Sequence, residues 1–298
     1  MGEDLPMLSQ VEILKKYHIR VRGHLGQHLL MDPNMVRKIV DGLGLDKAEP
    51  VLEIGPGLGS LTVELLSRGH PVLAIEKDKR FVEILQNEIV PAFPGQLSIV
   101  NRDILECDLS EMIRGREPEA LHDFREKMSL TKSGFKVVSN LPYYISTPIL
   151  FHLIAHRACF HSAVLMLQKE VAARMTAKPG TPDYGRLSVS ASIFGNTETL
   201  FDVSPKCFLP APEVTSRVIR YTFVPDEGLT EDESLPEIIR IAFSERRKTL
   251  LALLLKYWKP KKNRMELESI FAQLGFALNA RGEELATGQF RKLAEALK

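Results

Sequence analysis

The middle of the chain alternates short apolar runs with helical stretches from Pro50 to about Phe223. Apolar runs of four to six residues that are separated by helices are typical of a parallel sheet. Its strands are buried on both faces and are joined by helical crossovers. The pattern therefore predicts a large α/β domain built on a mostly parallel sheet, with the loops at the carboxyl ends of its strands available for ligands.

The expected elements of this sheet can be placed along the sequence. Strands are expected at Val51–Ile54, Pro71–Glu76, Leu97–Val100, Lys136–Ser139 and Ala163–Leu167, and Glu198–Val203 and Arg217–Phe223 are expected to close the sheet as a hairpin-like pair. Helices are expected at Ser60–Ser67, Asp78–Ile89, Pro148–His156 and Glu170–Met175.

The rest of the 298 residues divides around this sheet. We expect a basic amino-terminal segment at 1–49, the α/β domain at 50–225 and a small all-helical domain at 226–298. The helical domain follows an acidic linker, and helical spacing is seen at Leu235–Leu255 and Glu266–Leu274. A charged stretch at 110–134 has few apolar anchors and is expected to be a surface insertion.

Bulk properties exclude several classes of protein. With 44% hydrophobic and 26% charged residues the chain resembles an ordinary globular protein. Its three scattered cysteines argue against a disulfide framework or a zinc cluster and favour a reducing compartment. The sequence shows neither a signal peptide nor an apolar run long enough to span a membrane. We therefore expect a cytoplasmic protein without a metal. Because no long apolar surface helix is left over, we also expect a monomer.

Positive charge is concentrated in two places although the net charge is only +1. Nine Lys and Arg residues against a single acid lie between Arg240 and Arg264, including Arg246, Arg247 and Lys248. Six against one lie between Lys15 and Lys38. Local positive fields of this kind attract polyanions, so a nucleic acid is the expected partner.

A glycine-rich turn, Gly55-Pro56-Gly57-Leu58-Gly59, follows the first strand and precedes a helix. Such a turn lets the backbone approach a ligand. Glu76 ends the second strand, where a carboxylate can bind both hydroxyls of a ribose, and Asp103 follows the third strand, where it can accept a hydrogen bond from an adenine amine. NAD and S-adenosylmethionine both fit this pattern. The glycine spacing departs from G-x-G-x-x-G and favours S-adenosylmethionine.

The sequence Asn140-Leu141-Pro142-Tyr143 closes the fourth strand. The amide oxygen of Asn140 and the carbonyl of Leu141 can accept hydrogen bonds from an exocyclic amine. Pro142 stiffens the turn and Tyr143 offers a face for stacking. These residues predict a pocket for a planar base. Phe208, in a loop that contains Pro210 and Pro212, is expected to supply a second stacking face opposite Tyr143.

The segment before the sheet, Gly26-Gln27-His28-Leu29-Leu30, is expected to form a lid over the cofactor. His24 and His28 are four residues apart, but no third ligand is near, so a metal site is not expected.

Several motifs occur together and in order from about residue 20 to the end of the chain. They are Gly26–His28, Leu52–Gly59, Asn140–Tyr143 with Ile145–Pro148, Gln168–Val171, Tyr184–Val189, Phe208-x-Pro210-x-Pro212 and Arg246–Leu250. As a set they resemble the ribosomal RNA adenine N6-dimethyltransferases of the KsgA type.

The resemblance implies a Rossmann-like methyltransferase that uses S-adenosylmethionine to dimethylate two adjacent adenines near the 3′ end of small-subunit rRNA, during ribosome biogenesis. It also implies the residues that contact the cofactor. By the family pattern these are Gln27, His28, Leu30, Gly55, Gly57, Glu76, Asp103 and Asn140. The partner would be rRNA or a precursor of the small subunit.

The chain departs from the family pattern near the base pocket. Ser139 stands where the family more often has Gly, and Tyr144 where it more often has Asn. Leu25, Glu213 and Thr215 replace the more usual Phe, Lys and Asp. The departures at Ser139 and Tyr144 bear on the rate and the preferred substrate, whereas the residues expected to bind the cofactor are intact.

Three other functions fit parts of the sequence. An NAD-dependent oxidoreductase would need a proton-transfer residue beside the pocket, and the sequence offers no convincing one. A non-catalytic RNA or DNA binder would not need Asn140 or Glu76, and both are present. Methylation of an adenine in large-subunit rRNA or in DNA is the third.

Overall fold

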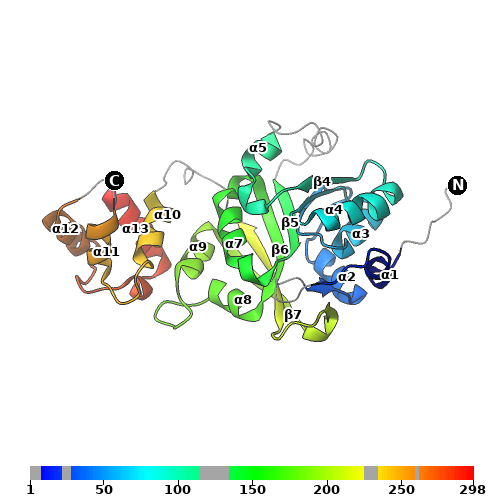
Figure 1. Cartoon of the computed structure of the whole chain (residues 1–298). Helices are drawn as coiled ribbons and strands as arrows, with labels where there is room; N and C mark the ends of the chain where they lie inside the picture. The colour runs from blue at the N-terminus through cyan, green and yellow to red at the C-terminus, as the bar shows by residue number, and fades with distance from the viewer. Residues whose placement is uncertain (1–7, 22–27, 115–133, 225–233, 259–261) are drawn as a thin grey trace. The chain divides into compact units, whose positions relative to one another are not determined.

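A mixed seven-stranded sheet is built from strands between residues 51 and 223 (Figure 1). The structure is a computed structural model that describes residues 8–21, 28–114, 134–224, 234–258 and 262–298. The strands are β2 Val51–Ile54, β3 Val72–Glu76, β4 Leu97–Asn101, β5 Phe135–Asn140, β6 Phe160–Gln168, β7 Gly195–Val203 and β9 Ser216–Phe223. The expected strands are confirmed to within one to three residues at each end.

The spatial order of the strands is β4-β3-β2-β5-β6-β9-β7. Strands β2 to β6 all run parallel to one another, whereas β9 pairs antiparallel to β6. The chain moves outward from β2 to β4 and then returns to the other side of β2 with β5. The order therefore reverses between β2 and β5, and at such a switch point a crevice opens outside the carboxyl ends of the strands.

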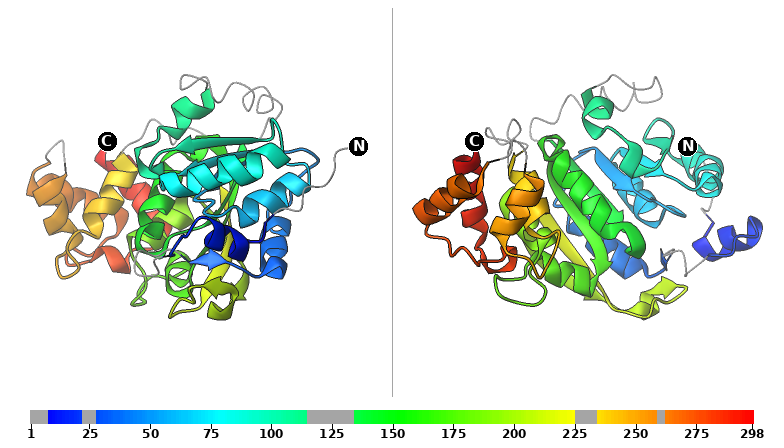
Figure 2. Two further views of the ribbon diagram at one scale, coloured as in Figure 1. Left: turned by 45° about the vertical axis from the view of Figure 1, so that its right-hand side comes forward. Right: turned by 60° about the vertical axis from the view of Figure 1, so that its left-hand side comes forward.

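Helices accompany the sheet in the first of two compact units, which comprises residues 1–171 and 198–223 (Figure 2). They are α1 Gln10–Lys16, α2 Pro33–Asp41, α3 Ser60–Ser67, α4 Lys79–Ile84, α5 Leu109–Arg114 and α7 Ser146–Ala155, and α8 Lys169–Met175 runs across the unit boundary. The expected helix at Asp78–Ile89 is α4 followed by one π-helical turn, Leu85–Ile89. Most of the expected insertion lies outside the described residues.

The core of this unit forms where α2 and α3 pack against the sheet. Strand side chains from Val51, Val138 and Val164 are fully buried, as is Leu65 on α3. Burial of one such side chain contributes about 1.5–3 kcal/mol. This packing holds the glycine-rich turn between β2 and α3 in place.

A separate two-stranded ladder joins segments far apart in the sequence. Strand β1, Leu29–Leu30, pairs antiparallel with β8, Phe208–Leu209, so that Leu30 lies opposite Phe208. The amide of Met31 also donates to the carbonyl of Cys207 at 2.8 Å. The ladder ties the predicted lid to the proline-containing loop.

The second compact unit comprises residues 172–197 and 224–298. Its helices are α9 Arg186–Phe194, α10 Ser234–Ala242, α11 Leu250–Tyr257, α12 Arg264–Leu274 and α13 Thr287–Leu297. The Tyr184 hydroxyl donates to the Leu285 carbonyl at 2.9 Å, and the Tyr184 ring meets the edge of Phe243. Contacts of this kind place residues 172–197 in the same compact unit as the helices of residues 224–298. Compactness does not test independent folding, so the division expected near 225 stays a prediction.

Candidate active site

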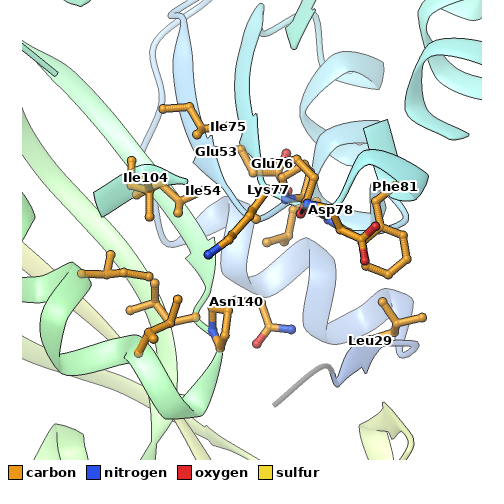
Figure 3. A pocket seen from close by; sticks show the side chains of 18 of the residues that line it. Leu29, Glu53, Ile54, Ile75, Glu76, Lys77, Asp78, Phe81, Ile104 and Asn140 are labelled. Atoms are coloured by element: carbon orange, nitrogen blue, oxygen red, sulfur yellow. Dashed lines mark hydrogen bonds between the residues drawn. The ribbon is translucent and has the colours of Figure 1, made fainter. Parts of the chain in front are cut away.

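The loops that follow β2 and β5 meet at the switch point of the sheet. A cavity of about 560 Å³ lies there, within the range of small-molecule sites. Figure 3 shows its apolar side chains, among them Ile54, Ile75 and Phe81, around a few polar ones. Apart from Gln27, which lies outside the described residues, every residue expected to bind the cofactor lines this cavity.

The glycine-rich turn and Glu76 are joined by hydrogen bonds. The amide of Gly57 donates to Glu76 Oε2 at 3.2 Å and the amide of Asp78 donates to Oε1 at 2.8 Å. Burial raises the pKa of Glu76, and these backbone bonds act in the opposite direction. A carboxylate has about four lone-pair sites. The backbone of Lys77 makes a further hydrogen bond that lowers the pKa of Glu76, and the carboxylate still has capacity to accept from a ligand hydroxyl.

The turn itself requires glycine at its end. Gly59 precedes α3 with a φ of 83°, in the left-handed region. A Cβ at this position would come within 2.3 Å of Ile89 Cδ1. The backbone therefore turns tightly into α3, and the amino end of that helix faces the same edge of the sheet as the cavity.

Asp103 and Lys77 form an ion pair at the cavity. Lys77 Nζ lies 2.7 Å from Asp103 Oδ2, while the amide of Leu105 donates to Oδ1 at 3.0 Å. Lys77 holds the pKa of Asp103 below its usual range. Figure 3 shows Lys77 reaching from the end of β3 over the cavity. Asp103 therefore remains an ionised acceptor beside the cavity.

Glu53 is a buried acid that the sequence patterns did not single out. It lies in β2, lines the cavity and is only 1% exposed. The Thr62 hydroxyl donates to Glu53 Oε2 at 2.6 Å. Burial raises the pKa of Glu53 to about 8, against the lowering effect of that hydrogen bond. A charged residue inside an otherwise apolar strand was the sequence signal for it.

The Asn140 amide is oriented by a backbone carbonyl. Its Nδ2 donates to the carbonyl of His28 at 2.9 Å. Because the amide nitrogen donates to this carbonyl, Oδ1 is free to accept a hydrogen bond from a ligand. Figure 3 shows the amide across the cavity from Glu76 and Lys77. Ser139, one residue earlier, is buried and donates to the Ile54 carbonyl at 2.6 Å, which fixes β5 against β2.

The residues after Asn140 are held from the neighbouring strands. The amide of Leu141 donates to the Met166 carbonyl of β6 at 2.9 Å. The Tyr143 hydroxyl lies 2.5 Å from Ser216 Oγ of β9. Burial raises the pKa of Tyr143, so its phenol remains neutral. The turn thus presents a fixed amide and a fixed ring at the cavity.

Phe208 does not lie opposite Tyr143, contrary to the expectation from sequence. Its side chain is 5% exposed and packs in the core with Leu30 and Val36. The physical reason is the β1–β8 ladder, which turns Phe208 toward the apolar interior. The ring near Tyr143 belongs to His28, with centroids 5.2 Å apart. His28 Nδ1 donates to the Pro210 carbonyl at 2.8 Å.

The basic triad of Arg246, Arg247 and Lys248 lies in the turn between α10 and α11, not within one continuous helix. Thr249 accepts from the amide of Ala252 and caps the start of α11, which breaks the predicted helix. Arg246 donates to the Pro182 carbonyl at 3.2 Å. Arg247 and Lys248 are exposed, and the backbone amide of Lys248 donates to the Glu245 carbonyl at 3.0 Å.

No group of three or more His, Cys, Asp or Glu side chains is placed to hold a metal ion in the ranges that the structure describes. Among the same residues, every helix is too short or too polar to cross a membrane.

Comparisons with known proteins agree on one family. The family model described as ribosomal RNA adenine dimethylase matches residues 19–296. The Ribosomal RNA small subunit methyltransferase A of Anoxybacillus flavithermus is 38% identical over 96% of this chain and 93% of its own length. The protein of that name from Alkaliphilus oremlandii is 35% identical over 96% of this chain and 95% of its own length.

Solved structures are similar over most of the chain. A dimethyladenosine transferase from Plasmodium falciparum has a TM-score of 0.68 and 27% identity, with 89% of this chain and 96% of that chain covered. The 23S rRNA methyltransferase ErmE has a TM-score of 0.58 and 25% identity, with 90% of this chain and 99% of that chain covered.

Proposed function

This chain belongs to the ribosomal RNA adenine dimethylase family, and from that premise we propose that it dimethylates N6 of two adjacent adenines near the 3′ end of small-subunit rRNA. The curated relatives at 35–38% identity are small-subunit enzymes, which supports this substrate over large-subunit rRNA. The observation that carries the proposal is the Asn140 amide, held by the His28 carbonyl at the switch-point cavity.

The proposed methyl donor is S-adenosylmethionine, whose sulfonium supplies an activated methyl group. Glu76 is the residue suited to the ribose hydroxyls, because its carboxylate lines the cavity at the end of β3 and its oxygens accept hydrogen bonds. Asp103 is suited to the adenine amine, because it is ionised and accepts hydrogen bonds. Gly55 and Gly57 line the same cavity with backbone alone, and Gln27, His28 and Leu30 are proposed to cover it.

The target adenine is proposed to bind at Asn140-Leu141-Pro142-Tyr143. Its N6 lone pair is delocalised into the ring and is a poor nucleophile. Hydrogen bonds from N6 to Asn140 Oδ1 and the Leu141 carbonyl would localise that lone pair and aim it at the methyl group. Stacking on Tyr143 would offset part of the cost of removing the base from its stack. Catalysis then rests on position and electrostatics, without an obligatory side-chain base.

Phosphate binding is proposed for Arg246, Arg247 and Lys248. Their charges are exposed, and counterion release on contact with RNA favours association. We further propose that the protein acts as a monomer in the cytoplasm, where small subunits are assembled.

Replacement of Asn140 by Ala tests the proposal. The variant should still bind S-adenosylhomocysteine, though more weakly, and should lose methyl transfer to unmethylated small subunits by about 100-fold or more, as when an oriented polar group is removed from other active sites. Asn196→Ala, at an exposed position, is the matched control and should retain the wild-type rate. Near wild-type transfer by Asn140→Ala would show that the pocket assignment is wrong.

A further inference from the structure

Tyr144 is an exposed aromatic residue at the cavity. It follows Tyr143 directly in a short 3₁₀ turn, and both residues line the cavity. Tyr143 is half-buried and bonded to Ser216, whereas Tyr144 is 65% exposed. One ring therefore belongs to the inner wall of the cavity and the next ring belongs to its rim. The mechanism proposed above does not use Tyr144.

An exposed cation lines the same cavity as this ring. The side chain of Lys77 is 69% exposed and lines the same cavity. The pKa of Lys77 is raised first by its hydrogen bond to Asp103 and, to a smaller extent, by an electrostatic interaction with Tyr144. The rim thus combines a flat aromatic face with an exposed positive charge.

An aromatic face beside a cation is the combination that holds single-stranded nucleic acid, because bases stack on the ring and phosphates attract the cation. Tyr143 and Tyr144 are adjacent in one turn and line one cavity, so their rings can serve neighbouring nucleotides. We propose that Tyr144 stacks on the base next to the target adenine and that Lys77 contacts the phosphate between the two nucleotides. This inference rests on the function proposed above.

The consequence concerns how two adjacent adenines are presented. While one adenine occupies the inner pocket, Tyr144 keeps its neighbour unstacked and ready to enter. Tyr144 is a positioning residue for the RNA, since it touches the neighbouring base and not the reacting nitrogen. Asn, the residue that the family more often has at this position, offers no comparable face.

Four substitutions of Tyr144 distinguish the contribution of its aromatic ring from those of its hydroxyl group and its apolar volume. Wild type, Tyr144→Phe, Tyr144→Leu, Tyr144→Asn and Tyr144→Ala are assayed for kcat and KM on unmethylated small subunits, and for the Kd of S-adenosylhomocysteine. The kcat/KM of Tyr144→Phe should remain within about twofold of the wild-type value. Leu, Asn and Ala should each lower kcat/KM about tenfold, the size expected for one lost stacking contact, chiefly through KM. All five proteins should bind S-adenosylhomocysteine equally well.

A binding measurement reports on stacking without catalysis. An RNA hairpin with two adjacent loop adenines carries 2-aminopurine in place of the neighbour of the target. Wild type and Tyr144→Phe should quench its fluorescence, and Tyr144→Leu should not. Val11→Ala, at another exposed apolar position, controls for general surface effects and should behave as wild type.

The outcomes are distinct. If Leu or Ala retains wild-type kcat/KM and quenching, or if the loss follows the affinity for S-adenosylhomocysteine, the role of Tyr144 is refuted while the proposed function stands. If wild type transfers no methyl group to small subunits, the proposed function fails. In that case quenching that depends on the ring still decides whether Tyr144 stacks on RNA.

Discussion

Replacement of the buried Glu53 by Gln should change how the stability of the protein depends on pH. Glu53 is 1% exposed, and burial raises its pKa to about 8 from 4.5. The folded protein therefore keeps this carboxyl protonated at pH values where the unfolded chain has released the proton. Because the folded pKa is the higher one, stability falls as pH rises from about 4.5 to about 8 and levels off above that range.

The magnitude follows from the two pKa values. Each tenfold difference in proton affinity is worth about 1.4 kcal/mol, so the wild type should lose about 3 kcal/mol between pH 5.5 and pH 8 through this group alone. Glu53→Gln retains an acceptor for the Thr62 hydroxyl and cannot ionise. Between pH 5.5 and pH 8, the free energy of unfolding of the variant should therefore rise by about 3 kcal/mol relative to that of wild type.

Urea titrations followed by circular dichroism at pH 5.5 and pH 8 measure this difference. Glu295→Gln removes an exposed carboxylate and is the matched control, for which the difference from wild type should be nearly the same at both pH values. A difference between Glu53→Gln and wild type that is independent of pH would mean that Glu53 is ionised in the folded protein. That result would refute the argument from burial.

Two other substitutions test the fold and the RNA surface. Phe208→Ala should lower the free energy of unfolding by about 3 kcal/mol in urea titrations, because it leaves a cavity in the core; a change below about 0.5 kcal/mol would indicate an exposed ring. Replacement of both Arg247 and Lys248 by Gln should weaken small-subunit binding and reduce the slope of log affinity against log salt by between one and two. An unchanged slope would show that neither residue contacts an RNA phosphate.

The sheet and most of the site could be predicted from the sequence because both follow from local patterns. Apolar runs locate the strands, and the carboxyl ends of parallel strands meet at one edge of a sheet. Glu76, Asp103 and Asn140 each follow or end such a run, so their convergence could be expected. Their placement on one cavity confirms that geometry, while their roles in binding stay proposals.

The parts that sequence did not predict depend on long-range contacts or on burial. The ladder that buries Phe208 joins residues 29–30 to 208–209, and no local pattern reports such a pairing. The sequence does not show that Glu53 is buried, because its burial depends on how other segments pack around β2. The helical spacing of Leu235–Leu255 continues across Arg246–Lys248 because periodicity does not register the capping bond that starts a new helix at Thr249.

The bond between the Asn140 amide and the His28 carbonyl has a practical consequence for shortened versions of this protein. A chain trimmed to begin at α2 would keep every strand of the large sheet, and its overall fold could look intact by spectroscopy. It would nevertheless lose the peptide group that orients the amide, together with the strand opposite Phe208. Shortened proteins that lack the first thirty residues should therefore be judged by turnover and not by their solubility.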